Sequence, residues 1–273
     1  MDIVKVSHVM KHLNTSIIDS TSFSLVRWGD GGLKFIDAII KQDINQMSRI
    51  GEKEGIPVDK MIEVMKLWGL SAKLADYIDS PHIYTTEKFW DRCKKGFKKI
   101  SKSTELKLHM WREIYSMAEM DNVNFCNPEI NFLSCLRNDH NMNILDIMKD
   151  RRVAFITACP EIKDKLTEFN VDIIPIVKQY EDHYHNSFIN TTKIIEECAN
   201  KYDLWLVAAG ELGRVYSGMI KFYGGRTFDI GFIPEFWLHG KLRDRLRSFL
   251  KPNPDNHLEL LLTEHGELYK EYI

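Results

Sequence analysis

Two glycine-rich segments contain the residues of this sequence whose types and spacing could bind a phosphate. The segment Arg27–Gly32 reads Arg-Trp-Gly-Asp-Gly-Gly, and the segment Gly210–Arg214 reads Gly-Glu-Leu-Gly-Arg. Glycine lets a ligand approach backbone N–H groups closely, and a helix that begins behind the glycine favours negative charge. Both segments also fit tight turns without a ligand, and Gly-x-x-Gly alone is a weak signal. Phosphate binding is therefore a hypothesis for both segments.

The first segment combines an acid, a cation and an open backbone. Asp30 lies among Gly29, Gly31 and Gly32, and Arg27 precedes them. We expect Gly29 and Gly31 to give a bulky ligand room, and Arg27 to contact a diphosphate or to pair with Asp30. The alternative is an Asp-Gly turn with Arg27 solvated. The coincidence of three useful features favours a site over this alternative.

A third segment, 178–187, concentrates acids and imidazoles. It contains Glu181, Asp182, His183 and His185. Metal ligation by a histidine with Asp182 would be chemically reasonable, as would general-base work by Glu181 or Asp182. No spacing rule singles out a ligand set, however, so a polar surface loop is the favoured interpretation.

Apolar runs precede each of these segments and predict the strands that position them. The alternating stretch 23–28 predicts a strand, and a helical stripe begins at Leu33. The continuous run Leu204–Ala209 is typical of a strand buried on both faces, and a helix over Val215–Phe222 follows it. Further strands are expected at 152–158, 171–177 and 227–230, with helices at 160–169 and 187–200 between them. This alternation predicts an α/β, Rossmann-like, mostly parallel sheet flanked by helices.

The rest of the chain completes one expected domain over residues 1–273. A helix is expected at 2–19, and the middle region, about 44–120, is expected to be mainly helical. Within it we predict a helix ending near Ile78, a strand at 82–86 and helices at 87–99 and 104–120. A short strand at 123–126 leads to the Rossmann-like half, about 150–240. An aromatic-rich segment at 232–240 follows the last strand, and a basic helix is expected at 241–250.

Composition limits the classes of function. The 273 residues have a formal net charge of −2, so bulk charge gives no reason to expect a nucleic acid or an acidic membrane as partner. The five cysteines are scattered, without Cys-x-x-Cys, which favours reduced thiols inside a cell. No apolar run approaches the roughly 18 residues that a membrane helix needs. These features predict a cytoplasmic protein without an integral membrane segment.

The two glycine segments together resemble the bacterial GT-D fold glycosyltransferases. The resemblance rests on Ser24–Gly31 and Leu206–Arg214, followed by Gly224-Gly225 and Asp229-Ile230-Gly231, and it spans about 23–240. It implies transfer of a sugar from a nucleotide diphosphate donor, commonly a UDP-sugar, onto a glycan or glycoprotein acceptor. In that family the first motif reads Arg-x-Gly-Asp-Gly-Glu, and its acids are associated with a divalent cation, Mn²⁺ or Mg²⁺.

This chain departs from the family pattern at one acid. Asp30 matches the first acid and remains the candidate metal ligand, but Gly32 stands in the position of the second. A metal could be held weakly by Asp30 with donor phosphates and water, or another acid such as Glu211 or Asp229 could substitute. Alternatively, the diphosphate is neutralised without metal by three cations: Arg27, Arg214 and Lys221.

Sugar transfer assigns further roles. Negative charge grows on the leaving diphosphate, and a carboxylate must accept the proton of the acceptor hydroxyl if the anomeric centre is inverted. We expect Gly210, Gly213 and Asp229 to form the donor cradle, and Glu211 and Asp182 are the candidate bases.

Two other functions stay open. A dehydrogenase also uses a strand, glycine turn and helix, although the full Gly-x-Gly-x-x-Gly pattern is missing. A non-catalytic nucleotide-sugar-binding protein would have lost the chemistry with the acid at position 32.

Overall fold

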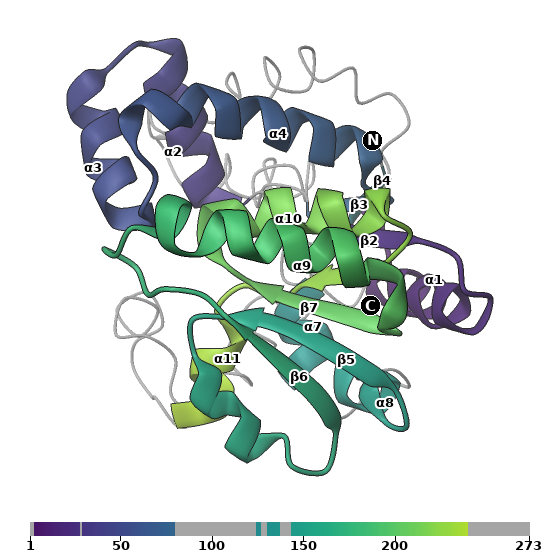
Figure 1. Ribbon diagram of the computed structural model, residues 1–273. Coiled ribbons are helices and arrows are strands. Elements are labelled where there is room, and N and C mark those ends of the chain that lie inside the picture. The colour runs from purple at the N-terminus through teal and green to yellow at the C-terminus, as the bar shows by residue number, and fades with distance from the viewer. Residues whose placement is uncertain (1–2, 28, 80–123, 127–129, 137–142, 240–273) are drawn as a thin grey trace, which may run out of the picture.

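The protein is built around one parallel sheet of eight strands (Figure 1). The computed structural model describes residues 3–27, 29–79, 124–126, 130–136 and 143–239. Every strand pair in the sheet is parallel, and the order is β1-β4-β3-β2-β8-β7-β5-β6. The predicted α/β fold with a mostly parallel sheet is confirmed. The strands are β1 (Ile3–Val4), β2 (Phe23–Val26), β3 (Tyr77–Asp79), β4 (Asn124–Cys126), β5 (Arg152–Thr157), β6 (Asn170–Pro175), β7 (Leu204–Ala208) and β8 (Arg226–Asp229).

Strand β8 comes last in the described sequence but lies in the middle of the sheet. It pairs with β2, where Phe23 is opposite Arg226, and with β7, where Trp205 is opposite Thr227. It therefore joins the strands of the first part of the chain to those of the second. Because all strands are parallel, the loops that follow β2, β7 and β8 emerge at the same edge of the sheet.

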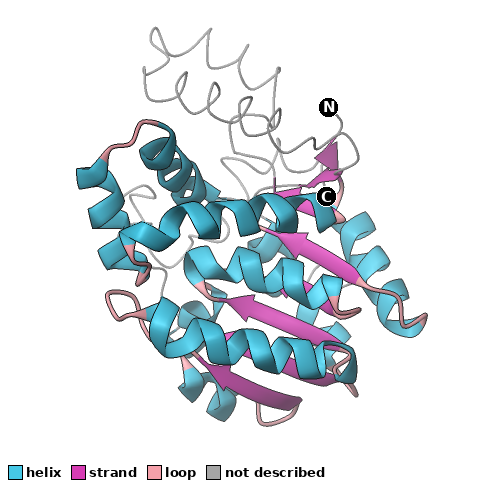
Figure 2. Ribbon diagram, turned by 45° about the horizontal axis from the view of Figure 1, so that its top comes forward, coloured by secondary structure: helices cyan, strands magenta, loops and turns pink. Residues whose placement is uncertain are grey.

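Helices cover both faces of the sheet (Figures 1 and 2). One face carries α2 (Gly29–Ile40), α3 (Ile44–Glu54), α4 (Met61–Leu74), α9 (Ile189–Cys198) and α10 (Gly210–Phe222). The other carries α1 (Val6–Ile18), α7 (Ile130–Leu136), α8 (Ile144–Met148) and α11 (Ile233–His239). Strand residues alternate between two apolar cores, as the pleat requires: Trp205 and Val207 face the first, and Leu204 and Leu206 face the second. The continuous apolar run of β7 is explained by this two-sided burial.

Helices α4 and α10 approach each other unusually closely. A Cβ atom at Gly218 of α10 would lie 2.7 Å from the Cα of Ser71 on α4, so only glycine fits there. Nearby, the indole Nε1 of the buried Trp68 donates a hydrogen bond of 2.9 Å to the carbonyl oxygen of Glu211. The start of α10 is thereby fixed against α4.

The structure differs from the sequence predictions at several elements. The N-terminal segment is not one helix, because β1 pairs with β4 before α1 begins. The glycines at 29–32 form the first turn of α2 rather than a loop. Tyr77–Asp79 is a strand where the end of a helix was expected, since it pairs on both sides with β2 and β4. A 3-10 helix, η2 (Pro160–Lys165), replaces the longer helix expected at 160–169, and the aromatic segment contains α11.

Some predictions fall outside the described residues. These are the strand at 82–86 and the helices at 87–99, 104–120 and 241–250.

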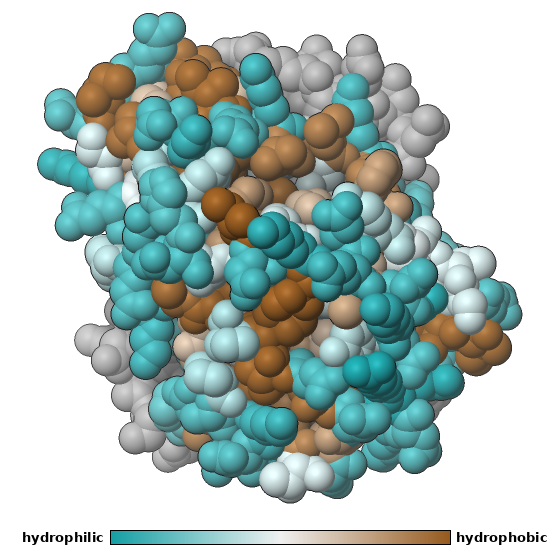
Figure 3. All heavy atoms as spheres, in the orientation of Figure 1, coloured by the Kyte–Doolittle hydropathy of each residue, from teal (hydrophilic) through white to brown (hydrophobic). Residues whose placement is uncertain are grey.

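On the face shown in Figure 3, hydrophilic side chains cover much of the surface, with apolar patches over the region of α3 and α4. Among the described helices, none has the length and hydropathy that crossing a bilayer requires.

Candidate functional site

A pocket of about 150 Å³ lies at the carboxyl edge of the sheet. It is lined by residues that follow β5, β6, β7 and β8, and by Glu54 at the end of α3. The chain leaves β5 through η2 toward β6 on one side, and leaves β7 through α10 toward β8 on the other. Open α/β sheets bind ligands where neighbouring connections diverge in this way. The pocket therefore occupies the expected ligand position of the fold.

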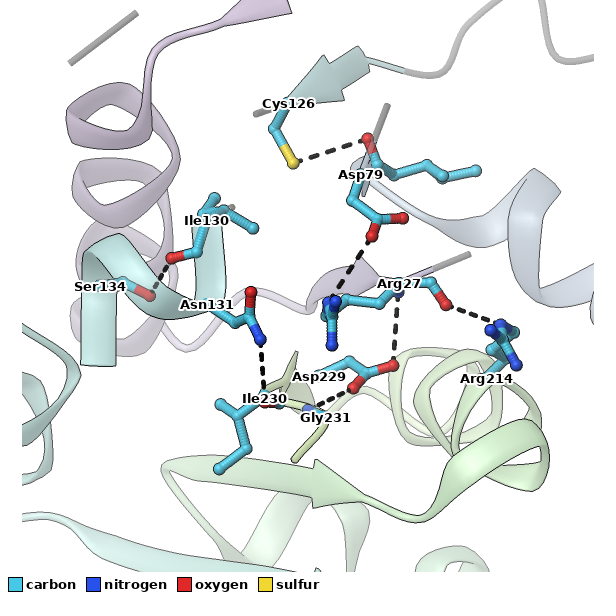
Figure 4. A network of polar contacts seen from close by, with 11 residues as sticks. Arg27, Asp79, Cys126, Ile130, Asn131, Ser134, Arg214, Asp229, Ile230 and Gly231 are labelled. Atoms are coloured by element: carbon cyan, nitrogen blue, oxygen red, sulfur yellow. Dashed lines mark hydrogen bonds and ion pairs between the residues drawn. The ribbon is translucent and has the colours of Figure 1, made fainter. Parts of the chain in front are cut away.

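Beside the pocket, Arg27 lies between two buried acids (Figure 4). Its Nε is 3.6 Å from Oδ2 of Asp79, and its backbone N–H donates to Oδ2 of Asp229 at 3.4 Å. The other oxygen of Asp229 accepts a 2.9 Å hydrogen bond from the N–H of Gly231. A Cβ at Gly231, where φ is +57°, would lie 2.0 Å from Nη1 of Arg27. Gly231 lines the pocket and Arg27 does not, so the guanidinium of Arg27 lies behind Gly231.

Arg214 connects the two glycine segments. Its Nε donates a 2.7 Å hydrogen bond to the carbonyl oxygen of Arg27, and its Nη1 forms an ion pair with Glu211. Its guanidinium stacks 4.5 Å above the ring of Trp68. A Cβ at Gly32 would lie 3.2 Å from its Nη2. The two segments thus meet at one edge of the sheet, and Arg214, which is 6% exposed, holds them together rather than facing the pocket.

Burial shifts the pKa values of the carboxyl groups in this cluster. It raises the pKa of Asp229 to about 6, although the charges of Arg27 and Arg214 oppose the shift. It also raises the pKa of Glu211, with Arg214 opposing and the nearby carboxylate of Glu54 acting in the same direction. Carboxyl groups perturbed in this way, next to a cleft, are typical of functional sites.

The raised pKa of Asp229 predicts a pH-dependent stability. A carboxyl group whose pKa is higher in the folded state stabilises the fold below its unfolded pKa, and this contribution is lost as pH rises through about 6. We expect the free energy of unfolding of the wild type, relative to Asp229→Asn, to fall by about 3 kcal/mol between pH 4 and pH 7. Urea unfolding of both proteins across this range measures the difference. Parallel pH profiles would contradict the assignment.

Two predicted site residues lie away from the cluster. Lys221 is in the last turn of α10, roughly 15 Å along the helix from Glu211, and pairs with Asp76 at 2.6 Å. Its predicted diphosphate contact is wrong, because the helix carries it to the opposite edge of the sheet. Asp182 is exposed and binds both the N–H and Nδ1 of His185, at 2.9 and 2.8 Å. It does not line the pocket beside the cluster and is no candidate base there.

The remaining predicted residues lie at the expected edge. Gly210, with φ of +54°, begins α10 and lines the pocket. Gly213 lies in the first turn, where an added Cβ would be 3.2 Å from Cγ1 of Val207, so it allows close packing of the helix on β7. Gly29, Asp30 and Gly31 lie in the first turn of α2, and the side chain of Asp30 is outside the described part of the structure.

Two site residues escaped the sequence analysis. Asp79 follows two residues that were expected to end a helix, so its position at a strand end was hidden. Glu54 lies in a helical segment with no motif around it, and only the tertiary structure brings it to Gly210. For Asp79 the apolar pair Tyr77-Ile78 before an acid was a usable signal; for Glu54 the sequence contains none.

The described residues contain no preassembled set of protein ligands for a divalent cation. No group of three potential acid, histidine or cysteine ligands occurs among them. Instead, two arginines, Arg27 and Arg214, already neutralise Asp79 and Glu211. Position 32, where the family has an acid, faces the guanidinium of Arg214. A metal at this edge would depend on Asp30.

Comparison with known proteins gives two similar solved structures. No protein-family model matches the chain, and no curated protein matches it. One structure, "Selenomethionine substituted structure of domain of unknown function 1792 (DUF1792)", is 15% identical with a TM-score of 0.47, over 85% of this chain and 85% of that one. The other, "The highly conserved domain of unknown function 1792 has a distinct glycosyltransferase fold", is 14% identical with a TM-score of 0.42, over 86% and 84%. That description assigns the glycosyltransferase fold to the matched protein. Identity at this level concerns the fold alone.

Proposed function

We propose that this protein is a glycosyltransferase that moves a sugar from a nucleotide diphosphate donor, a UDP-sugar, onto a glycan or glycoprotein acceptor. The observation that carries the proposal is the pocket at the divergence of β5 and β7, with the start of α10 on one side and the guanidinium of Arg27 behind Gly231. A leaving diphosphate needs this combination of helix N–H groups and a fixed cation.

The start of α10 supports the diphosphate role. Its N-cap residue is Ala209, whose side chain cannot cap the first N–H groups of the helix. Helix-start N–H groups without a side-chain cap bind anionic oxygens well. Gly210 lines the pocket with Oε2 of Glu54 against its backbone, so a diphosphate would reach this helix end beside that carboxylate. We place the donor diphosphate between this turn and Arg27.

The chemistry needs charge neutralisation and proton transfer. Arg27 supplies a cation that cannot lose its charge near neutral pH. If a Mn²⁺ or Mg²⁺ ion contributes, Asp30 is the residue that would hold it, together with donor phosphates and water. Glu211 remains the proposed base. It is buried and does not line the pocket, so it would have to release Arg214 and reach the acceptor hydroxyl before accepting its proton.

A thermal-shift panel tests the donor class. UDP, UDP-sugars, GDP-sugars and dTDP-sugars are each added with Mn²⁺ or with EDTA. A ligand at one hundred times its Kd stabilises a folded protein by about 2.7 kcal/mol, which raises the Tm of a chain of this size by about 5 °C. We expect this shift with UDP and UDP-sugars and not with the other donors. An unchanged Tm throughout the panel would contradict the proposal.

Turnover separates the remaining functions. Slow release of UDP from the bound UDP-sugar supports the transferase. Tight UDP binding without any release, with and without Mn²⁺, supports the non-catalytic binding protein, for which the missing acid at Gly32 is the motivating observation. A dehydrogenase would instead show nicotinamide-dependent absorbance changes.

A further inference from the structure

Glu54 is a buried carboxylate that lines the pocket from the end of α3. It is the last residue of α3, where the helix dipole disfavours a negative charge, and it is only 8% exposed. Its charge also acts on the buried carboxyl group of Glu211. Its one described ion-pair partner is its neighbour Lys53, whose side chain is 45% exposed. A buried carboxylate that lines a pocket is a candidate ligand-binding group.

The chain around Glu54 aims its carboxylate at the pocket. A Cβ at Gly210 would lie 2.7 Å from Oε2 of Glu54, so that oxygen rests against the bare backbone at the start of α10. The end of α3 is clamped by two hydrogen bonds to the loop after β6. The backbone N–H of Tyr180 donates to the carbonyl oxygen of Lys53, and the backbone N–H of Tyr184 donates to that of Gly55, both at 2.9 Å. Glu54 is therefore positioned by rigid backbone contacts.

Lys53 occupies only one of the two carboxylate oxygens. Its Nζ donates to Oε1 of Glu54. Within the described residues, no hydrogen bond reaches Oε2, the oxygen beside Gly210. An ionised carboxylate accepts hydrogen bonds and donates none, so Oε2 suits a ligand that donates, such as a hydroxyl group.

The size and lining of the pocket fit one sugar ring. Its volume of about 150 Å³ equals that of engineered cavities that hold a single six-membered ring of benzene. A nucleoside, with a base and a ribose, is larger. The lining combines polar groups of Glu54 and Gln179 with apolar groups of Ile176 and Phe232. A pyranose has the matching character, with hydroxyl groups at its edge and C–H groups on its faces.

We propose that the carboxylate of Glu54 binds hydroxyl groups of the donor's sugar ring in this pocket and so selects which UDP-sugar is used. The inference rests on the proposed function, because the diphosphate between α10 and Arg27 would place the attached sugar here. An acceptor sugar has the same hydroxyl chemistry. The experiment separates the two sources by comparing ligands that differ only in the donor sugar.

Calorimetric titration of UDP and of the best UDP-sugar from the panel tests the inference. Glu54→Gln keeps the size of the side chain and removes the charge. Hydrogen bonds to charged groups predict a loss of affinity for the UDP-sugar of about tenfold to hundredfold. The affinity for UDP should change less than about twofold, which also shows that the variant is folded. The matched control is Glu52→Gln, an exposed glutamate on the same helix outside this pocket, which should bind both ligands as the wild type does.

Three other results of the titrations would contradict the inference or the proposed function. If Glu54→Gln binds the UDP-sugar as well as the wild type does, Glu54 does not read the donor sugar, and a sugar in this pocket would belong to the acceptor. If Glu54→Gln weakens UDP and the UDP-sugar equally, the carboxylate acts on the nucleotide and the inference is wrong. If the wild type binds neither ligand, the proposed function fails and the inference fails with it.

Discussion

Arg27→Met is expected to abolish the UDP-dependent thermal shift and to lower the free energy of unfolding by about 3 to 5 kcal/mol. Methionine keeps much of the side-chain volume but removes the guanidinium that pairs with Asp79 and whose charge stabilises ionised Asp229; the two acids are 3% and 5% exposed. Removing one partner of a buried charge cluster leaves the other charges uncompensated. The diphosphate loses its fixed counter-charge in the same step. Urea unfolding and calorimetric titration with UDP measure the two effects.

A second arginine provides the matched control for Arg27. Arg152 pairs with Asp172 at 3.2 Å, but both side chains are about half exposed, and the pair lies at the start of β5. Exposed ion pairs contribute less than about 1 kcal/mol, so Arg152→Met should change stability little and leave UDP binding intact. An Arg27→Met variant that binds UDP as tightly as Arg152→Met would remove Arg27 from the site.

Arg214→Met is expected to cost about 3 to 5 kcal/mol of stability and to weaken UDP binding without any direct contact to the ligand. The variant leaves Glu211 as a buried carboxylate without its partner and the carbonyl of Arg27 without its 2.7 Å hydrogen bond. The loop between β2 and α2 would lose its link to α10. The free energy of unfolding and the Kd for UDP are the two measurements.

The double variant Arg214→Met/Glu211→Gln separates these two effects. Removing both members of a buried ion pair is often nearly neutral, so the double variant should recover most of the lost stability. It should still bind UDP more weakly than the wild type, because nothing restores the hydrogen bond to the carbonyl of Arg27. If stability and UDP affinity recover together, Arg214 contributes only to folding and does not position Arg27.

The sequence predicted the strands well where a strand is buried on both faces and its own residues form a recognisable apolar run. β5 and β7 have continuous runs of mostly apolar residues, and the glycines after β7 and β8 marked the edge that contains the pocket. β1 and β3 were missed because their two or three residues become strands only through pairing with β4 and β2. Such pairing is a tertiary effect that no short window of sequence contains.

The site was predictable only in part for a similar reason. Arg27, Gly210 and Asp229 stand in glycine motifs, and the structure places all three at one edge. The role of Arg214 was misjudged, since its burial against Trp68 depends on how α4 packs on α10. Lys221 was assigned to the site for its charge, although the helix expected over Val215–Phe222 already put it near the end away from Gly210. Glu54 could not be found from the sequence, because its place beside Gly210 joins positions about 150 residues apart in the chain.

The central position of β8 has a consequence for biosynthesis. A nascent chain emerging from the ribosome can form β2 and β7 early, yet their common neighbour appears only once residues 226–229 have been translated. Until then both strands expose unpaired edges, which are prone to aggregation. We expect chains that terminate before residue 226 to require chaperones and to be degraded rapidly, while the sheet can close as soon as β8 leaves the exit tunnel.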